Sequence, residues 1–401
     1  MDKVEELLTR GVANIVPSKE KLKKLLLSGK KFNIYVGIDP TATRIHLGHA
    51  VVLRKLKAFA KLEHKVTFLI GDFTAQIGDT SDKENERPVL TPIEIHENFK
   101  TYKKQAEKIL DFSKIKIVYN SEWLSKLNFS QVIELSRYFS INDFISRELI
   151  KKRLGEGKRV RLDEIFYPLM QGYDSLKLET DIQIGGTDQT FNMQAGRTLI
   201  KNIKDRESSF IATKFLTGSD GRKMSKTYGN AIWLDNDPID MYAKVMAIQD
   251  DLIIEYYTLG TDASLSEIDE VDGMLKTSEN PMKIKKQLAH RITSEFNNKD
   301  GAEKAANYFE SVIQKQENPF ELPLYMMPQT RTSGASISDV VFESGLAVSK
   351  SQAKRVIQQA GTVVNNEIVR DPNTPFTDYL KNNEAIIKVG KKNFVKIKIT
   401  G

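Results

Sequence analysis

The sequence predicts an α/β protein in which helices cover a parallel sheet, followed by a helical segment and a small, basic α+β module. Residues 32–200 alternate short apolar strand patterns with longer helical patterns. Residues 238–315 carry mainly helical patterns, and a stretch rich in proline and small polar residues follows at 316–334. A chain of 401 residues is long enough for two or three domains.

The elements of the first region follow in order from the spacing of their apolar residues. Ile34, Val36 and Ile38 alternate as in a strand, and the pattern ends at Asp39. Because open parallel sheets bind ligands at the carboxyl ends of their strands, polar residues that follow strands are the first site candidates. The remaining expected elements are a helix over 48–62, a strand over 66–70, a helix over 93–110, a strand over 115–119, helices over 130–152 and 162–177, a strand over 181–184 and a helix from about 188.

Composition narrows the classes of protein that this chain can belong to. The absence of cysteine excludes disulfides, thiolate chemistry and cysteine-based zinc sites. No apolar run reaches the roughly 20 residues that span a bilayer, and residues 1–6 lack the apolar core of a signal peptide. We therefore expect a cytoplasmic protein with no membrane contact. The net charge of +7 favours a polyanionic partner, although basic clusters such as residues 151–153 could equally be solvated surface.

The most informative motif is His46-Leu47-Gly48-His49, which follows the first predicted strand and opens a helix. The two imidazoles are three residues apart and are expected on one helix face, while Gly48 lets another group approach the backbone. A helix N-terminus attracts anions through its free N–H groups and its dipole. The motif predicts a nucleotide phosphate cradle. The alternatives are two surface histidines or a zinc site, but the nearby acidic ligand of zincin motifs is missing.

A second motif, Lys223-Met224-Ser225-Lys226-Thr227, follows the glycine-containing turn at residues 218–221. Two lysines three residues apart can close over a polyphosphate as point charges. Such charges matter most where negative charge develops in a transition state. On its own this motif could be an exposed basic turn.

The two motifs together resemble the two signatures of the class I aminoacyl-tRNA synthetases, in the same order. Residues 35–41 (Tyr-Val-Gly-Ile-Asp-Pro-Thr), 167–174 (Tyr-Pro-Leu-Met-Gln-Gly-Tyr-Asp) and 183–189 (Gln-Ile-Gly-Gly-Thr-Asp-Gln) resemble the bacterial tyrosyl-tRNA synthetase family. The resemblance covers nearly the whole chain. It implies a Rossmann-like catalytic domain over 1–225 with a dimer-forming helical insertion at about 120–160, an α-helical anticodon-binding domain over 226–320, a linker over 321–334 and an S4-like RNA-binding domain over 335–401.

The resemblance also assigns residues to the amino acid and to ATP. Tyr35 and Asp174 would flank the phenol hydroxyl of tyrosine, since a phenol both donates and accepts hydrogen bonds. The substrate ammonium would bind Asp79, Tyr167 and Gln171, and Gln183 would lie near the reacting carboxylate. The residues implied for ATP binding are Gly37, Asp39, Gly48, Gly186, Asp188, Gln189 and Lys226.

The catalytic and RNA-binding residues follow from the same resemblance. The residues that would stabilise the pyrophosphate end or contact the nucleotide are Thr41, His46, His49, Lys223 and Lys226. Lys83 and Arg87 match positions near pyrophosphate or the tRNA acceptor end, with a solvated loop as the alternative. In the tail, Lys350, Lys354 and Arg355 lie along a helix that resembles the S4 module, and a basic hairpin without a partner is the alternative.

The implied reaction joins L-tyrosine to tRNA(Tyr). ATP would enter with Mg²⁺ as a substrate, and neither a tightly bound cofactor nor a metal site of the protein is expected. A two-fold homodimer is expected by analogy with the family. Three alternatives remain: a tryptophanyl-tRNA synthetase on the same fold, a catalytically silent RNA-binding paralogue, and a nucleotidyltransferase that shares the fold.

Overall fold

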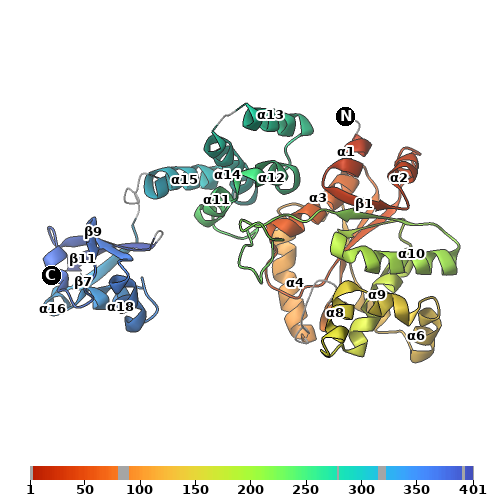
Figure 1. Ribbon diagram of the computed structural model, residues 1–401, viewed down its shortest axis with the longest axis horizontal. Helices are drawn as coiled ribbons and strands as arrows, with labels where there is room; N and C mark the ends of the chain where they lie inside the picture. Colours follow the sequence, from red (N-terminus) through yellow and green to blue (C-terminus); the bar gives the residue numbers. More distant parts are fainter. Residues whose placement is uncertain (1–2, 80–89, 278–279, 315–321, 391–392, 401) are drawn as a thin grey trace. The chain divides into compact units, whose positions relative to one another are not determined.

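The computed structural model describes residues 3–79, 90–277, 280–314, 322–390 and 393–400. Contacts divide the chain into two compact units, Met1–Ala305 and Ala306–Gly401 (Figure 1). Within the described ranges, no helix combines the length and the apolar character needed to cross a membrane.

A six-stranded sheet of order β1-β6-β5-β2-β3-β4 forms the centre of the first unit. Its strands are β1 (Val12–Val16), β2 (Asn33–Ile38), β3 (Lys65–Ile70), β4 (Lys116–Tyr119), β5 (Ile182–Gly186) and β6 (Ser209–Thr213). Strands β2 to β6 run parallel to one another, which confirms the predicted parallel sheet. The edge strand β1, antiparallel to β6, was not predicted. Only Ile15 is buried in this strand, so its sequence carries no clear alternation.

The strand order fixes where a ligand can bind. Strand β2 pairs with β3 on one side and with β5 on the other, in parallel in both cases. The chain runs from β2 through β3 to β4 at one edge, and then returns to β5 and β6 on the other side of β2. The carboxyl ends of β2 and β5 therefore border the topological switch point, where open α/β sheets leave a crevice.

Ten helices of the described chain precede β6. Their bounds are α1 (Lys3–Thr9), α2 (Lys19–Leu26), α3 (Leu47–Lys61), α4 (Pro92–Ala106), α5 (Ser121–Leu124), α6 (Phe129–Ser136), α7 (Ile141–Ile145), α8 (Glu148–Gly155), α9 (Leu162–Lys177) and α10 (Thr190–Lys204). Helices α9 and α10 pack side by side (Figure 1). The predicted continuous helix over 130–152 is wrong, because α6, α7 and α8 are separate. The hydroxyl of Ser140 accepts from Asn142 N–H and starts α7 as a new helix.

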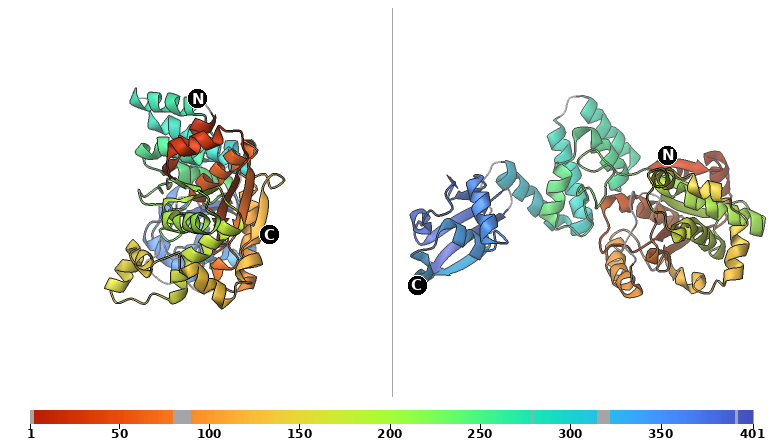
Figure 2. Two further views of the ribbon diagram at one scale, coloured as in Figure 1. Left: turned by 90° about the vertical axis from the view of Figure 1, so that its right-hand side faces the viewer. Right: turned by 60° about the horizontal axis from the view of Figure 1, so that its bottom comes forward.

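The helical segment after β6 gathers at one end of the first unit (Figure 2). It contains α11 (Pro238–Met246), α12 (Ile253–Gly260), α13 (Leu265–Lys276) and α14 (Pro281–Asn297). Helix α15 (Lys299–Tyr308) crosses the boundary between the two units, and the π-helical stretch at Phe309–Gln314 belongs to the second. Arg54 of α3 joins this segment to the sheet domain, because its guanidinium donates to the carbonyl of Gly260 (3.0 Å) and to the Glu295 carboxylate (2.7 Å).

The second unit contains a five-stranded sheet of order β7-β11-β10-β8-β9. Its elements are β7 (Leu324–Pro328), α16 (Gln329–Thr332), α17 (Ile337–Glu343), α18 (Lys350–Gln358), β8 (Thr362–Val364), β9 (Glu367–Val369), β10 (Glu384–Val389) and β11 (Asn393–Thr400). The predicted linker over 321–334 is wrong in its extent. Residues 324–328 pair in parallel with β11, and Met327 is fully buried in the core of this unit. The proline of this strand is tolerated because it lies at the end of an edge strand.

Candidate active site

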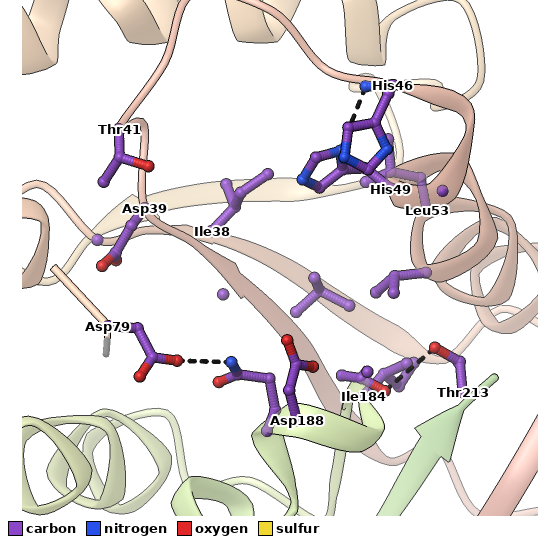
Figure 3. A pocket seen from close by; sticks show the side chains of 18 of the residues that line it. Ile38, Asp39, Thr41, His46, His49, Leu53, Asp79, Ile184, Asp188 and Thr213 are labelled. Carbon is purple, nitrogen blue, oxygen red and sulfur yellow. Dashed lines mark hydrogen bonds between the residues drawn. The ribbon is translucent and has the colours of Figure 1, made fainter. Parts of the chain in front are cut away.

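A cavity of about 440 Å³ lies at the carboxyl ends of β2 and β5 (Figure 3). Every residue predicted for catalysis, tyrosine or ATP lines it: Tyr35, Gly37, Asp39, Thr41, His46, Gly48, His49, Asp79, Tyr167, Gln171, Asp174, Gln183, Gly186, Asp188, Gln189, Lys223 and Lys226. Of the residues predicted for RNA, Lys83 and Arg87 lie outside the described residues. The three basic residues of α18 belong to the second unit.

Asp174 of α9 is a buried carboxyl group in the wall of this cavity, with 2% of its surface exposed. One of its oxygens accepts from Trp123 Nε1 (2.7 Å) and the other from Asn120 Nδ2 (3.1 Å). Burial raises the pKa of Asp174 to about 8, although both of these hydrogen bonds favour the charged form. A further hydrogen-bond donor in the cavity would therefore stabilise the charged form of this carboxyl group.

Tyr35 is fixed in the same wall by the residue after Asp174. Its hydroxyl shares a hydrogen bond with Ser175 Oγ (2.8 Å) and donates to Gln183 Oε1 (3.3 Å). The amide of Gln183 in turn donates to the carbonyl of Met193 (2.9 Å). Burial raises the pKa of Tyr35, so this side chain stays a neutral phenol. Strand β2 and helix α9 thus present one phenol and one carboxyl group to the same space.

Asn120 and Thr74 connect the two sides of the cavity, and the sequence reading missed both. The Asn120 amide, fully buried, donates to Asp174 and to Thr74 Oγ1 (3.0 Å). The Thr74 hydroxyl donates to Asp39 Oδ1 (2.8 Å), whose other oxygen accepts from the Tyr167 hydroxyl (2.8 Å). Asn120 directly follows the predicted strand 115–119, and that position at a strand end was the available signal.

Asp79 borders the cavity and is hydrogen-bonded to the segment after β5. Gln189 Nε2 donates to Asp79 Oδ2 (2.6 Å; Figure 3), and Asn192 Nδ2 donates to the same oxygen (3.3 Å). The structure therefore brings together a residue predicted for the substrate ammonium and one predicted for ATP. Both hydrogen bonds come from neutral amides.

The histidine motif has a different local structure from the one expected. His46 is the N-cap residue of α3 with an extended backbone, so it precedes the first turn and does not share a helix face with His49. The rings are still adjacent, with centroids 3.8 Å apart, because the backbone N–H of His46 donates to His49 Nδ1 (3.2 Å). A Cβ atom on Gly48 would come within 3.0 Å of the His46 ring. Glycine at this position therefore makes room for His46 itself.

The lysine motif lies on a loop that is anchored within the cavity wall. Lys223 Nζ pairs with Asp188 Oδ2 (3.2 Å) and lies 3.8 Å from the centre of the Phe215 ring. Met224 is buried, whereas Lys226 is exposed. Asn230 closes the loop, because its Oδ1 accepts from the backbone N–H of Ser225 (2.8 Å).

Both ends of this loop are attached to distant elements. At its start, Thr217 donates through its N–H (2.6 Å) and its hydroxyl (3.2 Å) to the carboxylate of Glu255 on α12. The Tyr256 hydroxyl donates to the carbonyl of Thr217 (2.8 Å). After the loop, Leu47 N–H donates to the carbonyl of Ile232 (2.8 Å), so the chain pairs with the start of α3. These attachments explain why the two motifs, far apart in sequence, border one cavity.

Comparison with known proteins agrees with this architecture. The family model described as tRNA synthetases class I (W and Y) matches residues 27–314, and the S4 domain model matches residues 337–378. The chain is 43% identical over 399 residues to a tyrosine–tRNA ligase of Carboxydothermus hydrogenoformans, covering 98% of this chain and 97% of the relative. It is 39% identical over 394 residues to that of Thermotoga maritima, covering 98% and 96%. This chain belongs to the tyrosine–tRNA ligase family.

Solved structures show the same fold over about three quarters of this family member. The tyrosyl-tRNA synthetase of Archaeoglobus fulgidus, complexed with L-tyrosine, aligns with a TM-score of 0.61 at 23% identity and covers 76% of this chain and 100% of that chain. A C-terminally truncated mitochondrial tyrosyl-tRNA synthetase of Aspergillus nidulans aligns with a TM-score of 0.65 at 23% identity, covering 77% and 94%.

The second unit of this synthetase carries the predicted RNA-binding residues on α18. Ser349 caps the helix by accepting from Gln352 N–H, and Lys350 and Lys354 follow at a spacing of four, on one face. Lys350 Nζ pairs with Asp339 of α17 (2.7 Å), and this pairing is the main reason why the pKa of Asp339 falls to about 2. Lys354 and Arg355 are exposed. Lys350, the first lysine predicted to bind RNA, is therefore already paired with a carboxylate.

Proposed function

We propose that this chain is a tyrosine–tRNA ligase, which activates L-tyrosine with ATP to tyrosyl-adenylate and pyrophosphate and then transfers the tyrosyl group to tRNA(Tyr). The observation that carries the proposal is the buried Asp174 carboxyl beside the Tyr35 hydroxyl, in the same cavity as the histidine and lysine motifs. Curated relatives that match almost their full length are named tyrosine–tRNA ligases. By class I analogy, transfer goes to the 2′-hydroxyl of the 3′-terminal adenosine.

The amino-acid end favours tyrosine on physical grounds. The substrate phenol would donate to Asp174 and accept from Tyr35, whose hydroxyl proton would then turn away from Gln183 Oε1. Phenylalanine offers neither interaction and would seal a buried carboxyl group away from water without a further partner, which is costly. At the other end of the amino acid, Asp79, Tyr167 and Gln171 would receive the ammonium group.

The activation step needs positioning and charge stabilisation. The tyrosine carboxylate, already ionised at pH 7, attacks the α-phosphorus of ATP in line; the P–O bond to the β-phosphate breaks and pyrophosphate leaves. Thr41, His46, Lys223 and Lys226 would stabilise the charge that develops on the leaving group, and His49 would contact the nucleotide. Mg²⁺ would enter as part of the MgATP substrate.

ATP binding would rearrange the contacts of Lys223. In the structure Lys223 pairs with Asp188, the residue proposed to accept from the ribose hydroxyls. When the ribose occupies Asp188, Lys223 becomes available to the phosphates. Gly37, Gly186 and Gln189 complete the proposed nucleotide site. A Cβ atom on Gly37 would make only ordinary contacts at 3.6 Å, so the protein's own packing does not demand glycine there.

We further propose a two-fold homodimer that forms through the α6–α9 region. Large apolar side chains are exposed there, including Phe129 (80%), Ile141 (59%) and Leu162 (69%). Exposed apolar groups of this size mark interaction surfaces, and a self-complementary surface gives a closed dimer. The tRNA would be held by the S4 unit through Lys350, Lys354 and Arg355 and near the acceptor end through Lys83 and Arg87. The cytoplasmic location stays a prediction.

One assay series tests the proposed function. ATP–pyrophosphate exchange is measured with tyrosine, tryptophan and phenylalanine offered separately, followed by charging of tRNA(Tyr). We expect exchange and charging with tyrosine alone. Exchange with tryptophan would identify the tryptophanyl alternative, RNA binding without exchange would identify a silent paralogue, and exchange without charging would identify a nucleotidyltransferase.

A further inference from the structure

One face of α4 holds the loop between β2 and α3. Asn98, Thr101 and Gln105 follow one another at spacings of three and four residues and therefore share a face of the helix. Asn98 Nδ2 donates to the carbonyl of Pro40 (2.9 Å), and Thr101 Oγ1 donates to the carbonyl of Thr43 (2.7 Å). The loop held in this way carries Thr41 and ends at His46, two residues of the proposed pyrophosphate site.

Gln105 makes the most extensive of these contacts. Its side chain is buried, with 4% of its surface exposed. Its Oε1 accepts from the backbone N–H of Ile45 (2.9 Å), and its Nε2 donates to the carbonyls of Thr43 (2.9 Å) and Thr101 (3.0 Å). An amide offers a donor and an acceptor on the same carbon, so a single side chain can hold both backbone groups.

The loop is also held from the opposite side of Ile45. The carbonyl of Ile45 accepts from Leu234 N–H (3.0 Å), in the segment that follows the lysine loop. Ile45 therefore has its N–H fixed by α4 and its C=O fixed by the chain from the second motif. Its side chain is fully buried. The residue immediately before His46 is therefore held by two separate parts of the first unit.

We propose that Gln105 is a positioning residue for the activation reaction, which sets Thr41 and His46 against the leaving pyrophosphate without touching substrate itself. This inference rests on the proposed function. Donors aimed at developing charge act only when they are held in place before the reaction, and a misplacement of about 1 Å can cost on the order of 100-fold in rate. The tyrosine end is built on β2, α9 and the residue after β4, so loss of Gln105 leaves it in place.

The test compares three full-length variants. Gln105→Glu is isosteric and keeps an acceptor for Ile45 N–H, but it replaces the Nε2 donor with an oxygen that repels the carbonyls of Thr43 and Thr101. Gln105→Met removes both interactions at similar volume without introducing a buried charge, and so covers the case in which the glutamate variant does not fold. Gln358→Glu makes the same chemical change at an exposed position of α18 and serves as the matched control.

For each variant, kcat and KM for ATP are measured by pyrophosphate exchange, Kd for tyrosine by calorimetry, and folding by thermal melting. We expect both Gln105 variants to lower kcat/KM for ATP by roughly 10- to 100-fold, with tyrosine affinity within about twofold of the original and Gln358→Glu unchanged. Normal exchange in a folded Gln105→Met protein, or an equal loss of tyrosine affinity, overturns the inference. Failure of the unaltered protein to exchange with tyrosine would instead reject the proposed function.

Discussion

The two ends of the cavity are built in different ways. At the amino-acid end, Asp174, Tyr35 and Asn120 come from a helix, a strand and a strand end, are buried, and hydrogen-bond to one another or to their neighbours. At the nucleotide end, the two lysines lie on a loop, Lys226 is exposed, and Lys223 pairs with a residue that a ligand would occupy. Recognition of a small difference between amino acids needs rigid, preorganised partners, whereas groups on a loop can change their contacts when a ligand binds.

The largest effect is expected at the buried end. Asp174→Ala removes the proposed acceptor of the substrate hydroxyl and also leaves Asn120 and Trp123 without this partner. We expect a loss of about 4 kcal/mol, or on the order of 1,000-fold in kcat/KM for tyrosine, with ATP binding nearly unchanged. Exchange kinetics measured at varied tyrosine and at varied ATP concentrations separate the effect on tyrosine from the effect on ATP. Equal losses for both substrates would mean that Asp174 does not belong to the amino-acid end.

The next effect tests the loop-built end. Lys226→Ala should lower the rate of pyrophosphate exchange by about 100-fold and barely change tyrosine binding, because the lysine acts on charge that develops in the transition state. Lys204→Ala, at an exposed position of α10, is the matched control. An unaltered exchange rate in Lys226→Ala would reject the role assigned to this lysine.

A smaller effect tests how the lysine loop is held. Glu255→Gln keeps the shape of the side chain but removes the charge from the two hydrogen bonds that Thr217 donates. We expect kcat of exchange to fall by roughly three- to tenfold, because charge-assisted hydrogen bonds are about twice as strong as neutral ones. The exposed Glu270→Gln on α13 should have no effect. A change in tyrosine Kd without a change in kcat would contradict this distinction between the two ends.

The smallest effect is a pH dependence of stability at the buried end. The pKa of Asp174 is about 8 in the folded chain and near 4 when unfolded, so between these values the folded state retains a proton that the unfolded state has lost. Stability therefore falls as pH rises through this window and levels off above it. Asp174→Asn removes this titration. As the pH rises from 5 to 8.5, we expect the Tm of the original protein to fall by roughly a few degrees relative to the Tm of Asp174→Asn. A constant Tm difference over that range would contradict the raised pKa.

Much of this cavity could be predicted because its residues occur in motifs or directly after strands. Asp39 follows β2, and Lys223 and His46 belong to recognisable spacings. Other contacts left no local signal. Gln105 contacts Ile45, which lies 60 positions away in the sequence. In the sequence it is a single glutamine within a predicted helix, with no motif around it. The break between α6 and α7 depends on a single serine cap, which apolar periodicity does not reveal.

Strand β7 sets the smallest piece of the second unit that can be produced by itself. A fragment that begins at residue 335, where the S4-like domain was expected, lacks β7 and exposes residues 396–400 of β11 as an unprotected edge. Such an edge presents a row of free N–H and C=O groups to other chains, and the core loses Met327. Fragments for RNA-binding work should therefore begin before Leu324; shorter ones are expected to aggregate, whatever their affinity for tRNA.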